Sequence, residues 1–408
     1  MRILISGASI AGPVLAYWLT RRGVDVTVVE RAPTLRKTGG HAVDLFRPSM
    51  EISAKMGVLP RIETLATGTD ALTMHREGRR RPIRVDLTKL TGAASDQHVE
   101  IMRDDLSEVY YDAGRDDVEY VFDDSITAIS PDGEVTFEHA PPRRFDVVVG
   151  ADGLHSNVRR LVFGEEAGLT RFIGGYLAVV SAPKTMAHHN EMFGHIGVGR
   201  LAVVYTADHL DDARIVFMFR SKKELEYDHR DALRQKELLR DAFAGMHPQV
   251  DRWLSEIDRT PAFYFDTISQ LQLNTWSRGR VTLVGDAGYC PGPAVGGSTS
   301  LAVIGAYVLA GELARAGGDY ERAFAAYERE MAESVLRSRA FARGAAKTII
   351  PGSRTAVWAL SRGLQLISLL PASLTTAVAK LNTKGVRMYD AMQVPDYSEV
   401  WQHSQHET

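Results

Sequence analysis

The feature that most constrains the fold is a glycine-punctuated segment at the N-terminus. Residues 2–6 (RILIS) form a short apolar run typical of a buried parallel strand, and residues 7–12 follow it with the spacing G-x-S-x-x-G. Residues 13–22 have helical spacing, Gly23 ends that helix, and residues 24–29 have the pattern of a second strand. This order predicts a βαβ unit and therefore an α/β fold with a parallel sheet.

The turn between the first strand and the helix has the chemistry of a pyrophosphate site. Gly7 permits the tight turn, Gly12 lets the helix pack closely, and the helix N-terminus offers free N–H groups and partial positive charge to phosphate. Ser9 replaces the middle glycine of the pattern, and a side chain as small as serine is compatible with phosphate there. The candidate contacts in this turn are Gly7, Ser9, Ile10, Ala11 and Gly12.

The second strand ends in Glu30, which Arg31 follows. A carboxylate at this position accepts hydrogen bonds from an adenosine ribose and disfavours a 2′-phosphate. The segment therefore predicts a tightly held NAD or FAD rather than NADP, with Glu30 and Arg31 as contacts. The motif alone does not choose between NAD and FAD.

Two later segments also end strands in polar, glycine-containing turns. Residues 145–159 (FDVVVGADGLHSNVR) run from an apolar strand into Asp152-Gly153, and residues 279–287 (GRVTLVGDA) run into Gly285-Asp286. The stretch PGPAVGGS at 291–298 follows, and a long apolar helix is expected from near Thr299. Turns at the carboxyl ends of strands are where α/β sheets bind ligands, so these turns are candidate contacts as well.

Together the three motifs resemble those of the class A flavoprotein monooxygenases, which have the para-hydroxybenzoate hydroxylase fold. Their order and spacing agree with that family, and the three motifs bracket roughly the first 320 residues. Residues 39–45 (GGHAVDL) resemble the branch that contains tetracycline-inactivating and aromatic-polyketide hydroxylases. The resemblance implies FAD as the cofactor and a Rossmann-like FAD-binding domain with an inserted β-sheet substrate domain and a C-terminal helix.

The resemblance also implies roles for individual residues. Arg103 contacts the ribityl-diphosphate chain, Asp152 contacts FAD and transiently NAD(P)H, and Asp286 hydrogen-bonds ribityl or diphosphate oxygens. The expected flavin contacts near the last motif are Gly285, Pro293, Gly296, Gly297 and Ser298, where Ser298 stands at a position that is glycine in many relatives. The N-terminus of the following helix is expected to face the flavin, with Ser298 or Thr299 as its cap.

The middle of the chain is expected to build the substrate domain. Strand patterns at 177–182, 200–206, 213–220 and 263–266 surround one amphipathic helix at 230–243. Candidate substrate contacts are Tyr205, Phe217, Phe219, Arg220 and Phe265, and no catalytic residue is assigned. The expected boundaries are 1–72, 98–170 and 276–345 for the FAD-binding domain, 73–97 for a substrate-domain hairpin, 171–275 for the substrate domain, and 346–408 for bridging helices.

The implied reaction is hydroxylation of an aromatic or polyketide-like molecule, tetracycline-like in one hypothesis. NADPH or NADH reduces FAD, and O2 forms the C4a-hydroperoxide that transfers one oxygen. No second G-x-G-x-x-G motif is present, so the reductant is expected to bind transiently to the FAD-containing body. Two alternatives remain open: a reductase of the same fold without oxygen insertion, and a non-catalytic flavoprotein that sequesters its ligand.

Composition excludes other classes. The formal net charge is −3, from 48 basic and 51 acidic residues, so no charge excess indicates a nucleic-acid partner. Cys290 is the one cysteine, and His188-His189 lacks a third ligand at suitable spacing, so no metal site is expected. The apolar stretch 355–381 contains Arg362 and Pro371, which disfavours a membrane span. We expect a cytoplasmic protein that is a monomer or weak homodimer.

Overall fold

The computed structural model describes residues 1–35, 39–87, 98–164, 168–260, 262–293, 297–369 and 384–402. Its first sheet has six strands in the order β17 (Ser277–Arg278), β18 (Val281–Leu283), β11 (Val147–Gly150), β1 (Arg2–Ser6), β2 (Asp25–Glu30) and β7 (Glu119–Phe122). Strands β18, β11, β1, β2 and β7 are parallel, and β17 is an antiparallel edge. The predicted βαβ unit is present, with α1 spanning Ala11–Thr20.

The second sheet has seven strands in the order β16 (Phe263–Leu271), β12 (Thr170–Pro183), β15 (Asp212–Arg220), β14 (Arg200–Tyr205), β13 (Glu191–Gly197), β4 (Ala71–Arg76) and β5 (Ile83–Asp86). All pairs are antiparallel except β13 with β4. The four strands expected in the middle of the chain are confirmed, and β13 is an additional strand. The predicted α/β fold class, with a mostly parallel first sheet and a separate, mostly antiparallel second sheet, is confirmed.

Helices and two small sheets complete the fold. A three-stranded sheet contains β8 (Ile126–Ile129), β9 (Glu134–Phe137) and β10 (Arg143–Arg144), and β3 (Ala42–Phe46) pairs with β6 (His98–Met102). The remaining α-helices are α2 (Arg47–Lys55), α3 (Leu59–Thr64), α5 (Arg103–Gly114), α6 (Asn157–Phe163), α7 (Ala232–Phe243), α8 (Pro248–Ser255), α9 (Asp286–Tyr289), α10 (Ser298–Arg315), α11 (Tyr320–Ile349), α12 (Arg354–Leu369), α14 (Lys384–Asp390) and α15 (Ser398–Gln402). Short 3-10 turns lie at Lys184–Met186 and Glu256–Asp258.

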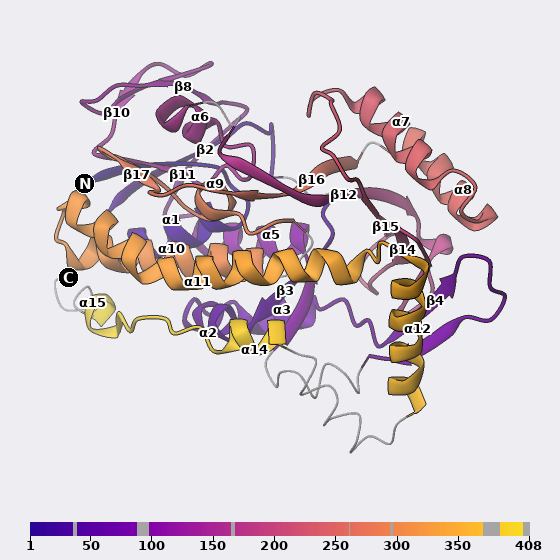
Figure 1. Cartoon of the computed structure of the whole chain (residues 1–408). Helices are drawn as coiled ribbons and strands as arrows, with labels where there is room; N and C mark the ends of the chain where they lie inside the picture. Colours follow the sequence, from indigo (N-terminus) through magenta and orange to yellow (C-terminus); the bar gives the residue numbers. More distant parts are fainter. Residues whose placement is uncertain are drawn as a thin grey trace.

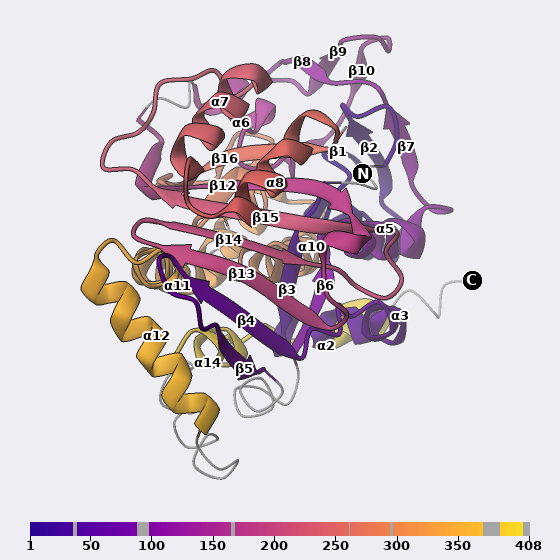
Figure 2. The ribbon, with the colours of Figure 1, turned by 90° about the vertical axis from the view of Figure 1, so that its right-hand side faces the viewer.

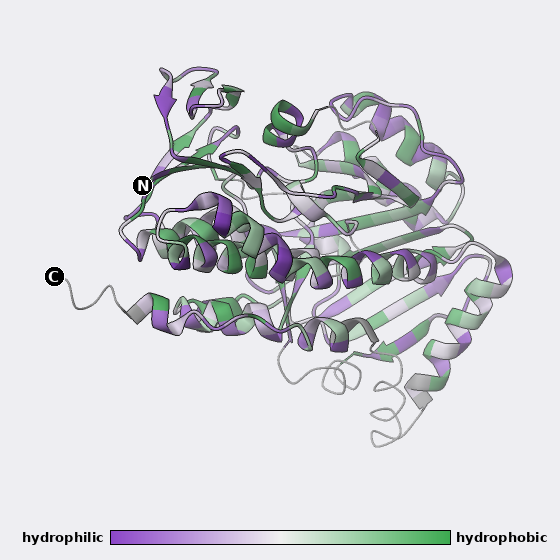
Figure 3. Ribbon diagram, turned by 60° about the vertical axis from the view of Figure 1, so that its left-hand side comes forward, coloured by the Kyte–Doolittle hydropathy of each residue, from purple (hydrophilic) through white to green (hydrophobic). Residues whose placement is uncertain are grey.

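The largest core surrounds the first sheet, where α1 packs against α10 and α5. We call this sheet with the helices packed on it the FAD-binding body, after the domain that the sequence predicts. Helix α10 is buried along most of its length because its residues are small and apolar, as the sequence pattern predicts. Hydropathy colouring shows green and purple mixed along α11 and α12, the pattern of helices with one covered and one open side (Figure 3).

The second sheet has helices on both faces. Helices α7 and α8 lie on one side of it and the long α11 on the other, with α12 running along the β13–β5 edge (Figures 1 and 2). After α12, the segment with α14 and α15 returns along the FAD-binding body towards the end where the N-terminus lies (Figure 1). Among the described residues, no helix is both long and apolar enough to cross a membrane.

Candidate cofactor and substrate site

The three motif turns come together because their strands are neighbours. Strands β18, β11 and β1 are adjacent and parallel, so the turns that follow them meet at one edge of the sheet. Backbone bonds tie the three motifs together: Ala151 N donates to Ser6 O (2.8 Å) and Val284 N to Gly150 O (2.9 Å). The edge is therefore the carboxyl end of the sheet, where α/β folds bind nucleotides.

The start of α1 fits a pyrophosphate. Its N-cap residue is Ile10, no side chain caps it, and its first turn carries no acidic residue, so its N–H groups stay available to an anion. Gly12 is required by packing, because a Cβ at this position would lie 1.9 Å from Gly7 O. Gly7 has φ +110°, which a residue with a side chain rarely adopts.

Glu30 is held in place by the backbone around it. Its Oε2 accepts a hydrogen bond from Ala8 N (2.9 Å) and its Oε1 from Ala32 N (2.9 Å). A carboxylate oxygen accepts more than one bond, so this arrangement fixes the side chain and leaves capacity for ribose hydroxyls. Arg31 lies exposed directly after β2.

Arg103 supplies positive charge beside the turn. Its Nη2 lies 3.2 Å from Ser9 Oγ, and Ser107 of the same helix α5 donates to Ser9 O (3.0 Å). Within the described part of the chain, no carboxylate lies at ion-pair distance from Arg103, so this guanidinium is available to phosphate. Burial, with the nearby Arg103, lowers the pKa of His41 to about 4, so His41 is neutral at physiological pH.

In the second motif, Asp152 and Arg159 have internal partners. Asp152 Oδ1 accepts from Ser156 Oγ (2.5 Å) and its Oδ2 from Val158 N (3.0 Å), so the carboxylate anchors the start of α6. Burial raises the pKa of this carboxyl group. The buried Arg159 donates through Nη1 to Ala287 O (3.0 Å), which joins the second motif to the third.

In the third motif, Asp286 follows Gly285 at the start of α9. The Ser298 hydroxyl donates to Asp286 Oδ1, which explains a serine at a position expected to be glycine: it binds the motif's carboxylate. The expectation that Ser298 or Thr299 caps α10 is wrong, because the N-cap is Gly297 and no side chain caps the helix. The N–H groups at the start of α10 are therefore not consumed by a side-chain cap.

The described residues before α10 are bonded to the second sheet. Pro291 O accepts from the buried Gln270 Nε2 (2.9 Å), Pro293 follows in a turn, and Gly297 has φ +76°. Gly296 lies outside the described residues.

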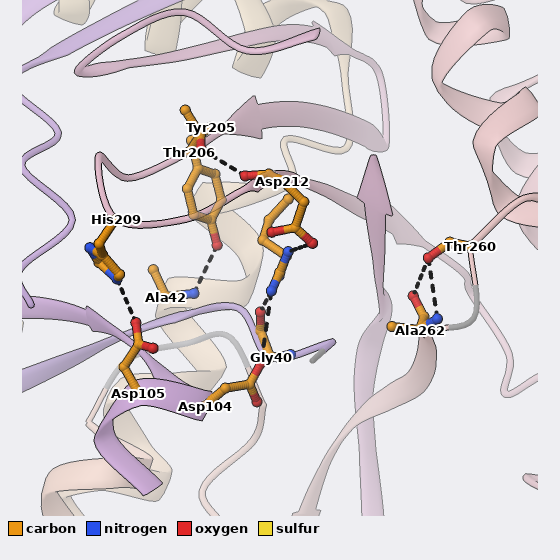
Figure 4. Close-up of polar contacts among 11 residues, drawn as sticks. Gly40, Ala42, Asp104, Asp105, Tyr205, Thr206, His209, Asp212, Thr260 and Ala262 are labelled. Carbon is orange, nitrogen blue, oxygen red and sulfur yellow. Dashed lines mark hydrogen bonds and ion pairs between the residues drawn. The ribbon is translucent and has the colours of Figure 1, made fainter. Parts of the chain in front are cut away.

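The loop around Gly40 is anchored to the second sheet. Tyr205 Oη accepts a bond from Ala42 N (2.8 Å), and Asp104 Oδ2 accepts one from Gly40 N (2.8 Å) (Figure 4). Arg214 Nε donates to Gly40 O (3.0 Å), and Arg214 also pairs with Asp212. These bonds join a loop of the FAD-binding body to strands β14 and β15.

Three of the candidate substrate residues lie on the face covered by α7 and α8. Phe217 is fully buried against Phe243, and Phe219 and Phe265 pack with Tyr176 in the same core. The expected role of these phenylalanines in substrate contact is therefore not supported by their location. Tyr205 holds the Ala42 loop, and Arg220 Nη1 binds Ile350 O (3.3 Å) at the end of α11.

The opposite face of the second sheet fronts the FAD-binding body and α11. Strand pairing places alternate residues there, and several of them are apolar but only half-buried: Leu72, Met192, Leu201, Val216 and Tyr264. We call these five residues the inner-face stripe. Tyr264 donates to the buried Asp266 Oδ2 (3.2 Å), which also lies 2.9 Å from His155 Nε2 in the second motif.

Several residues at the site were not among the sequence candidates. Arg214 and Asp104 secure the Gly40 loop, His41 lies beside Arg103, and Asp266 joins the second sheet to the second motif. A signal for Arg214 was present, because a charged residue inside an otherwise apolar strand predicts a buried partner. The other three positions depend on contacts between segments far apart in the sequence.

Comparisons with known proteins agree with this geometry. A family model described as "FAD binding domain" matches residues 1–337. A flavin-dependent monooxygenase of Legionella longbeachae is 34% identical over 335 residues, covering 80% of this chain and 84% of the relative. An uncharacterised protein of Mycobacterium tuberculosis is 42% identical over 341 residues, covering 83% and 91%. The crystal structure of tetracycline destructase Tet(55) is similar with a TM-score of 0.80 and 30% identity, over 97% of this chain and 98% of that one.

Proposed function

Because this chain belongs to the family of FAD-binding, flavin-dependent monooxygenases, we propose that it hydroxylates a small, largely apolar aromatic or polyketide-like molecule. FAD is its cofactor, and NADH or NADPH supplies the electrons. The observation that carries the substrate class is the inner-face stripe, whose half-buried apolar side chains lie on the same sheet face as Tyr205 and Arg214, the two residues bonded to the Gly40 loop.

Two arginines and two carboxylates near this face bear on the charge of the substrate. Arg214 and Arg220 are bound to backbone oxygens of Gly40 and Ile350. Asp44 and Glu100 lie directly opposite one another on the β3–β6 pair. Burial and the neighbouring Asp44 raise the pKa of Glu100, as expected where a second negative charge is destabilising. An apolar aromatic ring adds no charge, so it neither loses hydration of a charged group nor repels these carboxylates.

FAD supplies the redox and oxygen chemistry, and the residues of this chain bind and orient it. We assign pyrophosphate to the turn at Gly7–Gly12 with Arg103, and the adenosine ribose to Glu30. Asp286 and the loop that ends at Gly297 are assigned to the ribityl and ring end. The loop around Gly40, fixed by Tyr205 and Arg214, holds the ring edge facing the second sheet. Excluding water from this region protects the reactive cofactor from side reactions.

A tetracycline is one candidate substrate. The likeness to tetracycline destructase Tet(55) supports it, at 30% identity. The sequence GGHAVDL at residues 39–45, which resembles that branch, is a second support. A role in antibiotic resistance follows only if such a compound is accepted as substrate.

The test is the rate of NADH and NADPH oxidation with a panel of aromatic compounds. The panel pairs neutral multi-ring phenols with carboxylated analogues of similar size, and a tetracycline, which is zwitterionic near neutral pH, is assayed separately. We expect neutral compounds to raise the oxidation rate at least about tenfold over their carboxylated partners, equivalent to about 1.4 kcal/mol, and to gain one oxygen atom.

Two results would count against the proposal. Equal stimulation by carboxylated compounds would remove the argument from the inner-face stripe. NAD(P)H oxidation without any modified aromatic product would instead favour a reductase of the same fold.

A further inference from the structure

The C-terminal segment at residues 384–402 packs on the FAD-binding body rather than on the second sheet. Arg22 Nη1 donates to Val400 O (2.9 Å), and Arg315 Nη2 donates to Asp396 O (2.7 Å). The Tyr397 hydroxyl donates to Glu312 Oε1 (2.7 Å). In Figure 1 this segment (yellow) passes α2 and returns towards the end of the molecule where the N-terminus lies. It is therefore a docked part of the fold.

Tyr389, in α14, is the residue of this segment that contacts Phe46 at the end of β3 and Gly297 before α10. Its side chain is 1% exposed. The ring stacks on Phe46 with centroids 4.9 Å apart and planes 7° apart, and it meets Phe341 edge-on. Its hydroxyl bonds to Ser338 of α11, and burial raises its pKa to about 12, so it stays a neutral phenol.

Gly297 lies directly against the same ring. A Cβ at Gly297 would stand 1.8 Å from Tyr389 Cζ and 2.2 Å from its hydroxyl oxygen. Glycine is thus required twice at this position, by the ring and by φ +76°. The backbone that begins α10 rests on Tyr389 with no side chain between them.

Phe46 and Gly297 end the two segments that we assign to the ring end of FAD. Phe46 closes β3, which follows the Gly40 loop, and Gly297 closes the loop that begins at Pro291. Ser300 joins the two segments elsewhere, through bonds with Phe46 N (3.1 Å) and Asp44 O (3.3 Å). Tyr389 is a second link between them, made by aromatic packing.

We propose that Tyr389 is a positioning residue, which holds the β3 end and the start of α10 at the spacing that the flavin ring requires. The inference rests on the proposed function, since it takes FAD to lie between these segments. Asp390 adds to the link, because its Oδ1 accepts from Arg47 N (3.2 Å) and its carbonyl from the Arg47 side chain.

The test compares Tyr389→Leu and Tyr389→Phe with a matched control, Tyr397→Leu. Tyr397 is equally buried in the same segment, but it packs on Gly311, about 21 Å along α10 from Gly297 at the rise of an α-helix. FAD affinity is measured by flavin fluorescence, and the visible spectrum of bound FAD and the thermal unfolding midpoint are recorded for each variant.

We expect Tyr389→Leu to raise the Kd for FAD by about tenfold and to shift the visible flavin band. Tyr389→Phe keeps the stacked ring and is expected to stay within about threefold of wild type. Tyr397→Leu is expected to lower the unfolding midpoint while leaving the FAD Kd within about threefold and the spectrum unchanged.

If Tyr389→Leu loses only stability, as Tyr397→Leu does, Tyr389 is a structural anchor and the proposal is overturned. Should Tyr389→Leu not fold, Phe46→Leu removes the other ring of the stack, and an unchanged FAD Kd and spectrum there overturn the proposal equally. A wild-type protein that binds no FAD contradicts the proposed function instead, so the two failures are distinguishable.

Discussion

Burial sets the protonation of His195, which lies in a cluster of histidines between the second sheet and α8. His195 stacks on His247 at 4.1 Å and on His75 at 5.3 Å, and its Nε2 lies 3.2 Å from Gln249 Oε1. Burial, reinforced by the charges of His247 and His75, lowers the pKa of His195 to about 4. Protonation of this ring would therefore destabilise the folded protein.

The lowered pKa predicts how stability depends on pH. Between pH 6.5 and about 4, the unfolded chain binds a proton at His195 that the folded protein does not, so the free energy of unfolding falls as pH falls. We expect a loss of about 1–3 kcal/mol from this group across that window. His195→Gln should make the decline of the unfolding midpoint shallower.

The matched control is His189→Asn, at a largely exposed side chain. It is expected to leave the pH profile of the unfolding midpoint as in wild type. A His195→Gln profile parallel to wild type between pH 6.5 and 4 would show that His195 does not carry this dependence.

At single positions, the sequence predicted glycines better than large side chains. Gly7 and Gly12 follow from local backbone geometry, and the structure has them where the motif requires. The locations of Phe217 and Phe265 could not be predicted from local geometry, because both faces of their strands carry apolar residues. The neighbouring elements decide which face of a strand packs against a helix and which face lies towards the FAD-binding body.

At the scale of elements, the start of α1 carries the clearest requirement. Helix and turn touch through Gly12, so a methyl group there must push α1 away from Gly7 O. Gly12→Ala is expected to raise the FAD Kd at least about tenfold and to cost about 1–3 kcal/mol of stability. FAD titration and denaturant unfolding measure the two effects.

Gly344→Ala serves as its control, because Gly344 lies in α11 and no atom beyond its own helix stands within 4 Å of the added methyl group. Alanine at such a position should stabilise the helix by about 0.5–1 kcal/mol without changing FAD affinity. If Gly12→Ala binds FAD as tightly as Gly344→Ala does, the assignment of the phosphate to this turn is wrong.

Most elements could be predicted because their patterns are local. The βαβ unit, the four strands expected in the second sheet and the amphipathic helix α7 are confirmed within a few residues, apart from the longer β12 and β16, whereas β13 was not predicted. The partner of Arg159 could not be predicted, because it belongs to the third motif, 128 residues further along the chain. FAD could be predicted as the cofactor because three motifs in the right order are more specific than one, and the matching family model confirms this prediction.

At the scale of the molecule, the proposed site lies where the two sheets meet. The first sheet supplies the nucleotide turns, the second supplies the inner-face stripe, and Tyr205 and Arg214 bind the second sheet to the Gly40 loop. The order of the strands β18, β11 and β1 makes motifs far apart in the sequence neighbours in space. The domain boundaries expected from the sequence remain predictions.

The measurement that tests the central claim most directly is the fate of isotopically labelled O2. The purified protein with bound FAD is given NADPH, labelled O2 and the aromatic compound that most stimulates NADPH oxidation, and the products are analysed by mass spectrometry. We predict an aromatic product that carries one labelled oxygen atom for each molecule made. An aromatic compound recovered unchanged, with all of the label in hydrogen peroxide, would contradict the account.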